Sequence, residues 1–227
     1  MHAKAQISVD DAINTRKSVR AFKPDPVPLE TVKHILNVAA RAPSGTNVQP
    51  WQVHVLTGAE KDRMTAEVMK RREAGPPTAE FNYYPVKWFE PYLARRRKLG
   101  WEMYGLLGIT RENKAGMKAQ HDRNFKFFDA PVGLFFSFHR DLERGSWLDM
   151  GMFLQNVMLA ARGQGLHTCP QAAWIEYPQT VVEVLGIAPE YQFVCGMSLG
   201  YEDESAVVNT LVVDREPCET FTTFRGF

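Results

Sequence analysis

The sequence has no excess of charge of either sign. Its 227 residues include 27 Lys and Arg against 26 Asp and Glu, which gives a formal net charge of +1. Proteins that are drawn to nucleic acid or anionic lipid by their overall field carry a marked basic excess, which is missing here. Any anion that this protein binds must therefore be held by a few cations gathered at one site.

Long apolar runs and paired cysteines are also missing. The longest apolar run, residues 130–138, is too short to span a bilayer, and residues 1–6 contain no apolar core of a secretory signal. The three cysteines, Cys169, Cys195 and Cys218, are odd in number and show no metal-ligand spacing. We therefore expect reduced thiols, a cytoplasmic location, no membrane span and no metal site.

The apolar residues that are present follow regular patterns. Hydrophobic residues make up 44% of the chain, enough for a full core. Their periodicity predicts helices at 9–16, 28–39, 59–74, 93–105, 111–124, 146–162 and 177–186, and strands at 51–56, 132–138 and 193–201. Ser8 with Asp11, and Ser146 with Asp149, have the spacing of N-terminal capping boxes. Apolar residues surround most of the helix that follows Ser146, so we expect that helix to be nearly buried on all sides.

These elements predict an α+β fold, with helices around a mixed sheet, in a single domain that covers residues 1–227. Residues 81–125 are expected to form a helical insertion or lid, because 81–92 is aromatic but irregular and polar helices follow it. The C-terminal arm, residues 202–227, has no amphipathic period and ends in spaced aromatic residues. It needs a surface to pack on, which is either its own domain or a partner subunit.

Three cations and a hydroxyl lie within five residues, at Arg16, Lys17, Ser18 and Arg20. Phosphate is bound well by fork-shaped Arg donors with hydroxyl or backbone donors beside them. The same cations could instead offset the dipole at the end of the first predicted helix. Taken alone, the segment leaves both interpretations open.

A second polar cluster, residues 42–51, lies between a predicted helix and a predicted strand. It reads Ala-Pro-Ser-Gly-Thr-Asn-Val-Gln-Pro-Trp. Two prolines stiffen this loop, so its polar side chains can bind a polyhydroxylated or heterocyclic ligand with little loss of conformational entropy. Alone, the loop is equally typical of a structural turn.

Together, residues 16–20 and 42–51 resemble the FMN-dependent nitroreductase family. The resemblance continues in Gly-Leu-His-Thr-Cys-Pro-Gln-Ala at 165–172, in the strand that ends at 200–201, and in Arg215 of the arm, so it covers nearly the whole chain. It implies a sandwich of helices around a mixed, mainly antiparallel sheet, in a homodimer that exchanges its C-terminal arms and holds FMN at the subunit interface. It also implies NAD(P)H as the reducing co-substrate, in a ping-pong hydride transfer through the flavin.

The resemblance implies three groups of FMN-binding residues. The phosphate and the pyrimidine edge are assigned to Arg16, Lys17, Ser18, Arg20 and Arg215, with Lys17 acting more through its backbone; the opposite subunit is assigned Pro43, Ser44 and Asn47; and the flavin ring is expected along Pro170, Gln171, Ala172 and Ala173. Many family members have an acidic residue and a glycine where this chain has Ala172 and Ala173, so we expect a backbone role there. No side chain is a strong candidate for a general acid, and the catalytic residue stays unassigned.

Three further features have ordinary explanations. The aromatic residues between 82 and 104 are the expected wall of a substrate pocket, with core packing as the alternative. The basic run 95–98 is expected to be a solvated face rather than a nucleic-acid site. The six histidines show no metal spacing.

The expected function is therefore an FMN-dependent oxidoreductase that uses NAD(P)H to reduce small nitroaromatic or quinone-like acceptors. Enone reduction, reductive dehalogenation and flavin degradation are alternatives on the same scaffold. A flavin-binding protein without turnover is an alternative from another class. The sequence does not distinguish NADH from NADPH, because it contains no fingerprint for a nicotinamide nucleotide.

Overall fold

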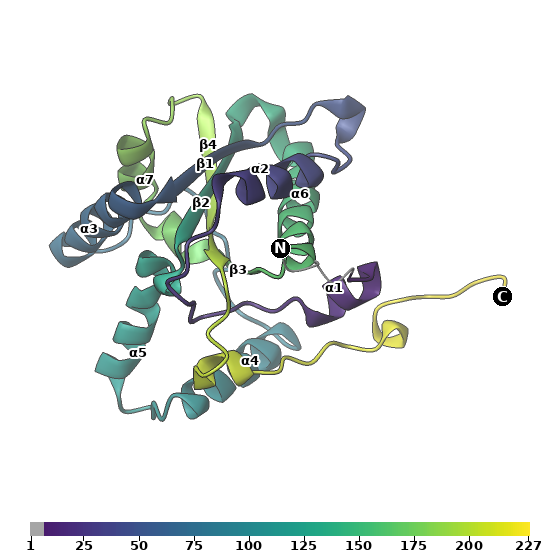
Figure 1. The fold of residues 1–227 in the computed structure, drawn as a ribbon. Helices are drawn as coiled ribbons and strands as arrows, with labels where there is room; N and C mark the ends of the chain where they lie inside the picture. Colours follow the sequence, from purple (N-terminus) through teal and green to yellow (C-terminus); the bar gives the residue numbers. More distant parts are fainter. Residues whose placement is uncertain (1–6) are drawn as a thin grey trace.

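The computed structural model describes residues 7–227 (Figure 1). The helices are α1 (Val9–Thr15), α2 (Leu29–Ala39), α3 (Gly58–Ala74), α4 (Tyr92–Leu106), α5 (Lys114–Asp122), α6 (Glu143–Gly163) and α7 (Pro178–Leu185), and the strands are β1 (Gln52–Thr57), β2 (Val132–His139), β3 (His167–Gln171) and β4 (Tyr191–Gly200). Among these described residues, no helix is long and apolar enough to cross a membrane. Residues 1–6, on which the expectation about a secretory signal rested, lie outside the described part.

The four strands form one sheet in the order β1-β2-β4-β3, and each neighbouring pair is antiparallel. A parallel bridge between Ser18 and Thr168 adds the segment after α1 to the outer side of β3. The predicted α+β class with a mainly antiparallel sheet is confirmed. The sequence did not predict β3, because Pro170 is disfavoured within a strand; at the edge of the sheet it is tolerated.

Helices cover both faces of the sheet, as the sandwich prediction requires (Figure 1). On one face, α2 and α6 pack on Leu134 and Phe136 of β2. On the other face, Phe135 of β2 joins a core with α3, α7 and two 3₁₀ turns, η2 (Arg123–Asp129) and η4 (Ala172–Glu176). Because β2 is buried on both faces, its sequence is a continuous apolar run instead of an alternation.

One glycine of β4 allows an unusually close approach to the sheet. Trp174 of η4 is fully buried and makes edge contacts with Phe125 and Phe135. A Cβ on Gly196 would lie 2.4 Å from Cδ1 of Trp174, closer than any real Cβ contact. Only glycine at this position lets the indole lie directly on the strand.

Two predictions about α6 are wrong. The helix begins at Glu143, one turn before the predicted capping box, so Ser146 and Asp149 are buried inside it. Asp149 accepts a hydrogen bond from the Gly45 backbone N–H at 3.2 Å and thereby tethers the 42–51 loop. The helix is also not buried on all sides, because Leu148 is 70% exposed.

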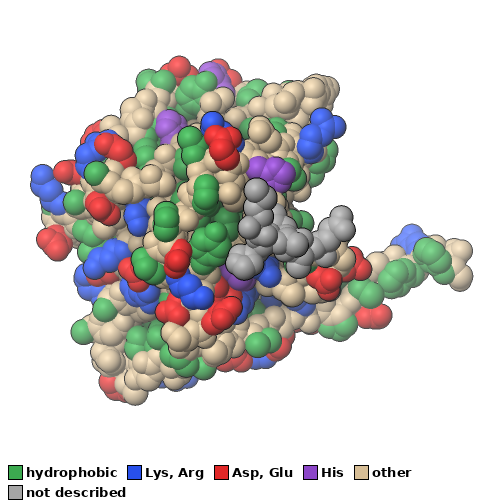
Figure 2. Space-filling view, in the orientation of Figure 1, with side chains coloured by type: hydrophobic (Ala, Val, Ile, Leu, Met, Phe, Trp, Pro, Cys, Tyr) green, Lys and Arg blue, Asp and Glu red, His purple; other side chains and the backbone are tan. Residues whose placement is uncertain are grey.

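The C-terminal arm has two parts. Residues 202–210 fold back on the chain's own domain, where Val208 and Asn209 are buried. From Leu211 the arm continues past α4, through the ion pair between Arg95 and Glu216, and its last part runs away from the body. Figure 2 shows the projecting end with hydrophobic side chains along it. Because Arg95 pairs with the arm, the expectation that the basic run 95–98 forms a solvated face holds only in part.

Replacing Gly196 by Ala is expected to destabilise the protein by about 2 kcal/mol, because the added methyl overpacks the Trp174 contact. The matched change Gly105→Ala, on an exposed turn of α4 with open space around it, should cost nothing or add about 0.5 kcal/mol. Urea unfolding of both variants at one protein concentration measures the difference. Equal stability of the two variants would contradict the close approach.

Candidate functional site

A cavity of about 590 Å³ lies where β3 ends. We call it the first cavity. Part of its lining comes from Arg20 and from residues 169–173, 175 and 176 of β3 and η4. The rest comes from residues 79 and 81–86 of the aromatic loop, from Met103 and Tyr104 of α4, and from residues of α5 and η2. The aromatic part of this lining lies in the segment that was expected to form the substrate wall.

Residues 16–20, which we call the cation segment, lie against β3 beside this cavity. The Val19 N–H donates to the Thr168 carbonyl at 3.1 Å, and the Arg20 guanidinium donates to the Ser18 carbonyl at 3.2 Å. Burial raises the pKa of the Cys169 thiol to about 11. The charge of Arg20, a hydrogen bond with Ser18 and the charge of Arg16 all lower this pKa, but by less than burial raises it. The structure therefore gathers these three predicted residues at the start of the 169–173 segment.

The charge of Arg215 acts on Arg16, although both are cations. Burial, and next the neighbouring Arg215, lower the pKa of the half-buried Arg16. Within residues 7–227 neither guanidinium has a carboxylate partner; Arg215 donates only to the carbonyls of Val213 and Asp214. Two guanidinium groups without carboxylate partners, close enough to affect one another electrostatically, favour binding of a multiply charged anion.

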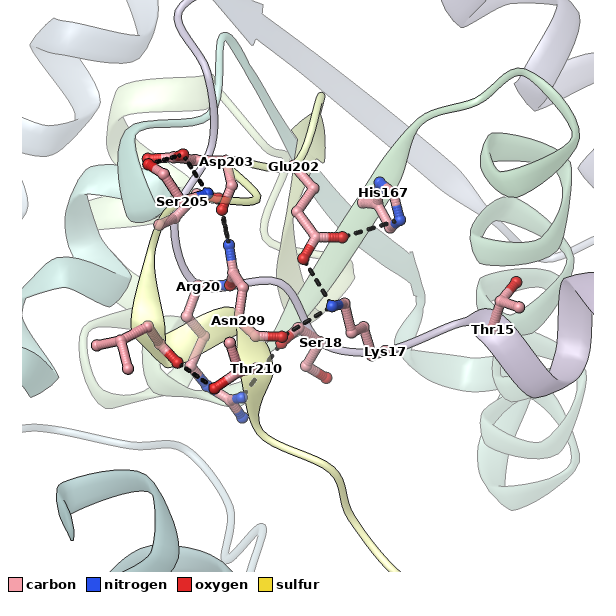
Figure 3. A network of polar contacts seen from close by, with 12 residues as sticks. Thr15, Lys17, Ser18, Arg20, His167, Glu202, Asp203, Ser205, Asn209 and Thr210 are labelled. Carbon is pink, nitrogen blue, oxygen red and sulfur yellow. Dashed lines mark hydrogen bonds and ion pairs between the residues drawn. The ribbon is translucent and has the colours of Figure 1, made fainter. Parts of the chain in front are cut away.

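The Lys17 ammonium, by contrast, is paired with residues of the C-terminal arm. Its Nζ lies 2.6 Å from Oε1 of Glu202 and donates to the Asn209 carbonyl at 2.7 Å. Figure 3 shows Glu202 between Lys17 and His167. Because the ammonium is occupied, the contribution to FMN binding that remains for Lys17 is the predicted one through its backbone.

His167 is neutral because it is buried and lies beside two cations. Nη1 of Arg162 is 2.8 Å from Nε2 of His167, and a guanidinium can only donate, so Nε2 must accept. Glu202 Oε2, 3.2 Å from the same nitrogen, then faces no proton and makes no hydrogen bond. Burial first, and then the charges of Arg162 and Lys17, lower the pKa of His167 to about 4.

The 170–173 segment presents backbone and small side chains to the first cavity. Gln171 is 2% exposed, and its side chain is held inside, donating to the Asn124 carbonyl at 2.7 Å and accepting from Ser198 Oγ at 2.9 Å. Pro170, Ala172 and Ala173 line the cavity beside it. This arrangement suits the predicted backbone role and leaves no free polar side chain in the segment.

The 42–51 loop does not reach the first cavity of its own chain. Pro43 lines a second cavity, of about 420 Å³, together with residues of α6 that include Trp147 and Leu148. Ser44 Oγ accepts from the Gln49 N–H at 3.0 Å, and Asn47 has a φ of 60°. The two cavities share no residue, so one chain alone does not bring Pro43, Ser44 and Asn47 to the other predicted residues.

Arg72 holds a polar wall of the first cavity that the sequence did not reveal. This 14% exposed side chain donates to Asp122 (2.6 Å), Tyr177 (3.2 Å), Glu176 (3.3 Å) and Nδ1 of His121 (3.1 Å). Since Nδ1 accepts, neutral His121 carries its proton on Nε2, 3.4 Å from Glu176. Its partners are 49 to 105 residues away from Arg72 in sequence, and no spacing pattern connects them.

Comparison with known proteins assigns this arrangement to a family. A match to the Nitroreductase family covers residues 13–201. The chain belongs to the Nitroreductase family. The resemblance inferred from residues 16–20 and 42–51 is thus confirmed.

Relatives of nearly the same length lie within this nitroreductase family. A chloronitrobenzene nitroreductase from Comamonas testosteroni is 41% identical over 219 residues, 95% of this chain and 96% of that protein. A 4-nitrobenzoate reductase from Pseudomonas putida is 40% identical over 218 residues, 96% of each protein. The crystal structure of the FMN and NADPH-dependent nitroreductase NfnB from Sphigopyxis sp. strain HMH matches with a TM-score of 0.95 at 38% identity, over 97% of this chain and 100% of that one.

Replacing His167 by Gln is expected to change how stability depends on pH. Because the pKa is about 4 in the folded protein and about 6.5 in an unfolded chain, the unfolded state binds more protons between these values. The contribution of this histidine is therefore complete above pH 6.5 and is lost as the pH falls toward 4. Urea unfolding across this range should show uptake of about one proton fewer in the variant; an unchanged slope would contradict the neutral imidazole.

Proposed function

We propose that this protein is an FMN-dependent nitroreductase that oxidises NAD(P)H and reduces nitroaromatic or quinone-like acceptors. The observation that carries the proposal is the meeting of the cation segment with residues 169–173 at one end of the aromatic first cavity. The full-length relatives are named as nitroreductases, one of them as FMN and NADPH-dependent. The function expected from the sequence agrees with these relatives.

The residues present fit the chemistry of FMN. Arg16 and Arg215 would hold the phosphate, since they form an uncompensated pair of guanidinium groups. Arg20 lines the first cavity and would offer positive charge to the edge of the flavin ring. Ala172 and Ala173 are small enough for a flat ring to lie against the backbone.

When bound, FMN accepts two electrons from NAD(P)H and delivers them to the acceptor. The chain's own residues bind and orient the reactants. The tyrosines at 83, 84 and 104 line the first cavity, where they give flat rings a surface to stack on and keep water away. His121 and Glu176, held by Arg72, give the first cavity a polar wall. No side chain is assigned as a general acid, and solvent supplies the protons.

The proposal also includes a homodimer. Trp147 and Leu148 on α6 are exposed beside Pro43 in the second cavity, and the arm carries the exposed Phe221 and Phe224. Apolar surface of this extent on one helix favours a partner. A second copy would cover it and carry Pro43, Ser44 and Asn47 to the first cavity of the neighbouring subunit, in the way the resemblance implies.

The remaining parts of the proposal concern the organisation and location of the chain. We treat residues 1–227 as one domain, with 81–125 as a lid and 202–227 as the arm. A cytoplasmic location is supported by the three cysteines, of which none is in a disulfide. Enone reduction, reductive dehalogenation, flavin degradation and binding without turnover are the alternatives that the experiment below separates.

An anaerobic titration of the FMN-loaded protein with NADPH and with NADH tests the function. We expect one or both nucleotides to bleach the visible flavin absorbance, and a nitrobenzene or a quinone to restore it. Restoration only by an enone or a halophenol would assign one of the alternative reactions. Bound FMN that neither nucleotide reduces would indicate a binding protein, and failure to bind FMN would overturn the proposal.

The Arg16→Ala and Arg215→Ala variants should bind FMN at least tenfold more weakly than the wild type, because each loses a charge-assisted bond worth about 1.5–3 kcal/mol. Fluorescence quenching on addition of FMN measures the dissociation constant. The control is Arg97→Ala, which removes an exposed cation from α4. An equal loss in all three variants would mean that only overall charge matters.

A further inference from the structure

We propose that Asn209 is a positioning residue for the cofactor site, which holds the cation segment in its binding geometry without contacting the cofactor. The inference rests on the proposed function, because it concerns the same FMN site. It assigns a role to a residue of the C-terminal arm that does not belong to the three predicted groups of FMN-binding residues. Figure 3 shows Asn209 beside Arg20, in the network that joins the cation segment to the tail.

Asn209 uses its whole side-chain amide in the protein interior. It is 3% exposed and lies in η5 (Val207–Thr210), the last turn before the arm leaves the domain. Its Oδ1 accepts from the Arg20 backbone N–H at 2.8 Å, and its Nδ2 donates to the carbonyls of Ala21 at 2.8 Å and Asp203 at 2.9 Å. A buried amide with both donor directions and its acceptor in use has one orientation.

These bonds replace a strand neighbour that the cation segment lacks. Residues 16–22 belong to no strand; they are joined to the sheet by isolated bridges, Ser18 to Thr168 and Phe22 to Glu202. Between those bridges, the Asn209 amide pairs with the N–H of Arg20 and the carbonyl of Ala21 as a neighbouring peptide group would. The backbone position of Arg20 is therefore set by a side chain 189 residues later in the sequence.

The other end of the cation segment is tied to the same residue. The Asn209 carbonyl accepts from the Lys17 ammonium at 2.7 Å, and Glu202 holds that ammonium from its other side. Lys17 and Arg20 are thus both anchored on Asn209, which leaves Ser18 and Val19 between them to lie against β3. The contacts with the C-terminal arm fix this shape of the segment, so its geometry is preorganised for binding.

Substitution of Asn209 by Leu, which has a similar size but no hydrogen-bonding group, tests the role. We expect the FMN dissociation constant to rise about tenfold or more, because binding must then order the segment. We also expect the reduction potential of the bound FMN to become more negative, because Arg20 is no longer held at the ring edge. The second variant, Asn209→Asp, keeps the acceptor for the Arg20 N–H and loses both donors. Its affinity for FMN should therefore lie between those of the wild type and of Asn209→Leu.

A stability-matched control separates positioning from general loosening. Ile35→Ala truncates a fully buried side chain of α2, whose core cluster contains no residue of the cation segment, and is expected to lower the melting temperature without moving the potential. All proteins are full-length, and their melting temperatures are measured without added FMN. If Asn209→Leu does not fold, Asn209→Asp gives the same comparison.

Two results would overturn the inference. One is a folded Asn209 variant whose FMN dissociation constant stays within about twofold of the wild type and whose reduction potential equals that of the wild type within error. The other is an Ile35→Ala variant of equal melting temperature that shows the same loss of affinity and the same shift of potential. Failure of the wild type itself to bind FMN would instead overturn the proposed function.

Discussion

The hydrogen bonds that hold residues 16–21 between β3 and the tail are the constraint on which the site depends. Val19 is bound by Thr168 on one side, and Arg20 is bound by Asn209 on the other. Without these bonds, a short segment outside any strand would have no defined place beside the sheet. Because they exist, the cations lie at the end of β3, where the first cavity and the backbone of 170–173 begin.

The same constraint explains how an almost neutral chain concentrates positive charge. Lys17 is neutralised by Glu202, and the neighbouring His167 stays uncharged because burial, and next the charges of Arg162 and Lys17, lower its pKa. Arg16 and Arg215 keep their charges uncompensated at one place. A balanced surface with one local excess gives selectivity for a small anion without the long-range attraction that a basic protein has for nucleic acid.

The sequence predicted those parts that depend on local pattern. The α2 stripe, the apolar run of β2 and the cation segment were all visible as periodicity or as clustering. Interactions between distant residues were not visible. Ser146 and Asp149 had capping spacing, but the structure uses Asp149 to tether Gly45 and begins the helix one turn earlier. Asn209 and Arg72 have partners that are far away in sequence, so no window of residues could reveal their roles.

The central claim is that each site takes its cations from one subunit and its 43–47 loop from the other. Mixing two inactive variants tests it: Arg16→Glu, and Asn47→Asp, which tolerates the φ of 60° and adds a repelling charge. After subunit exchange, half of the dimers are mixed and each contains one intact site, so activity should recover to about a quarter of the wild type. Activity that stays at the level of the two parents would contradict a shared site.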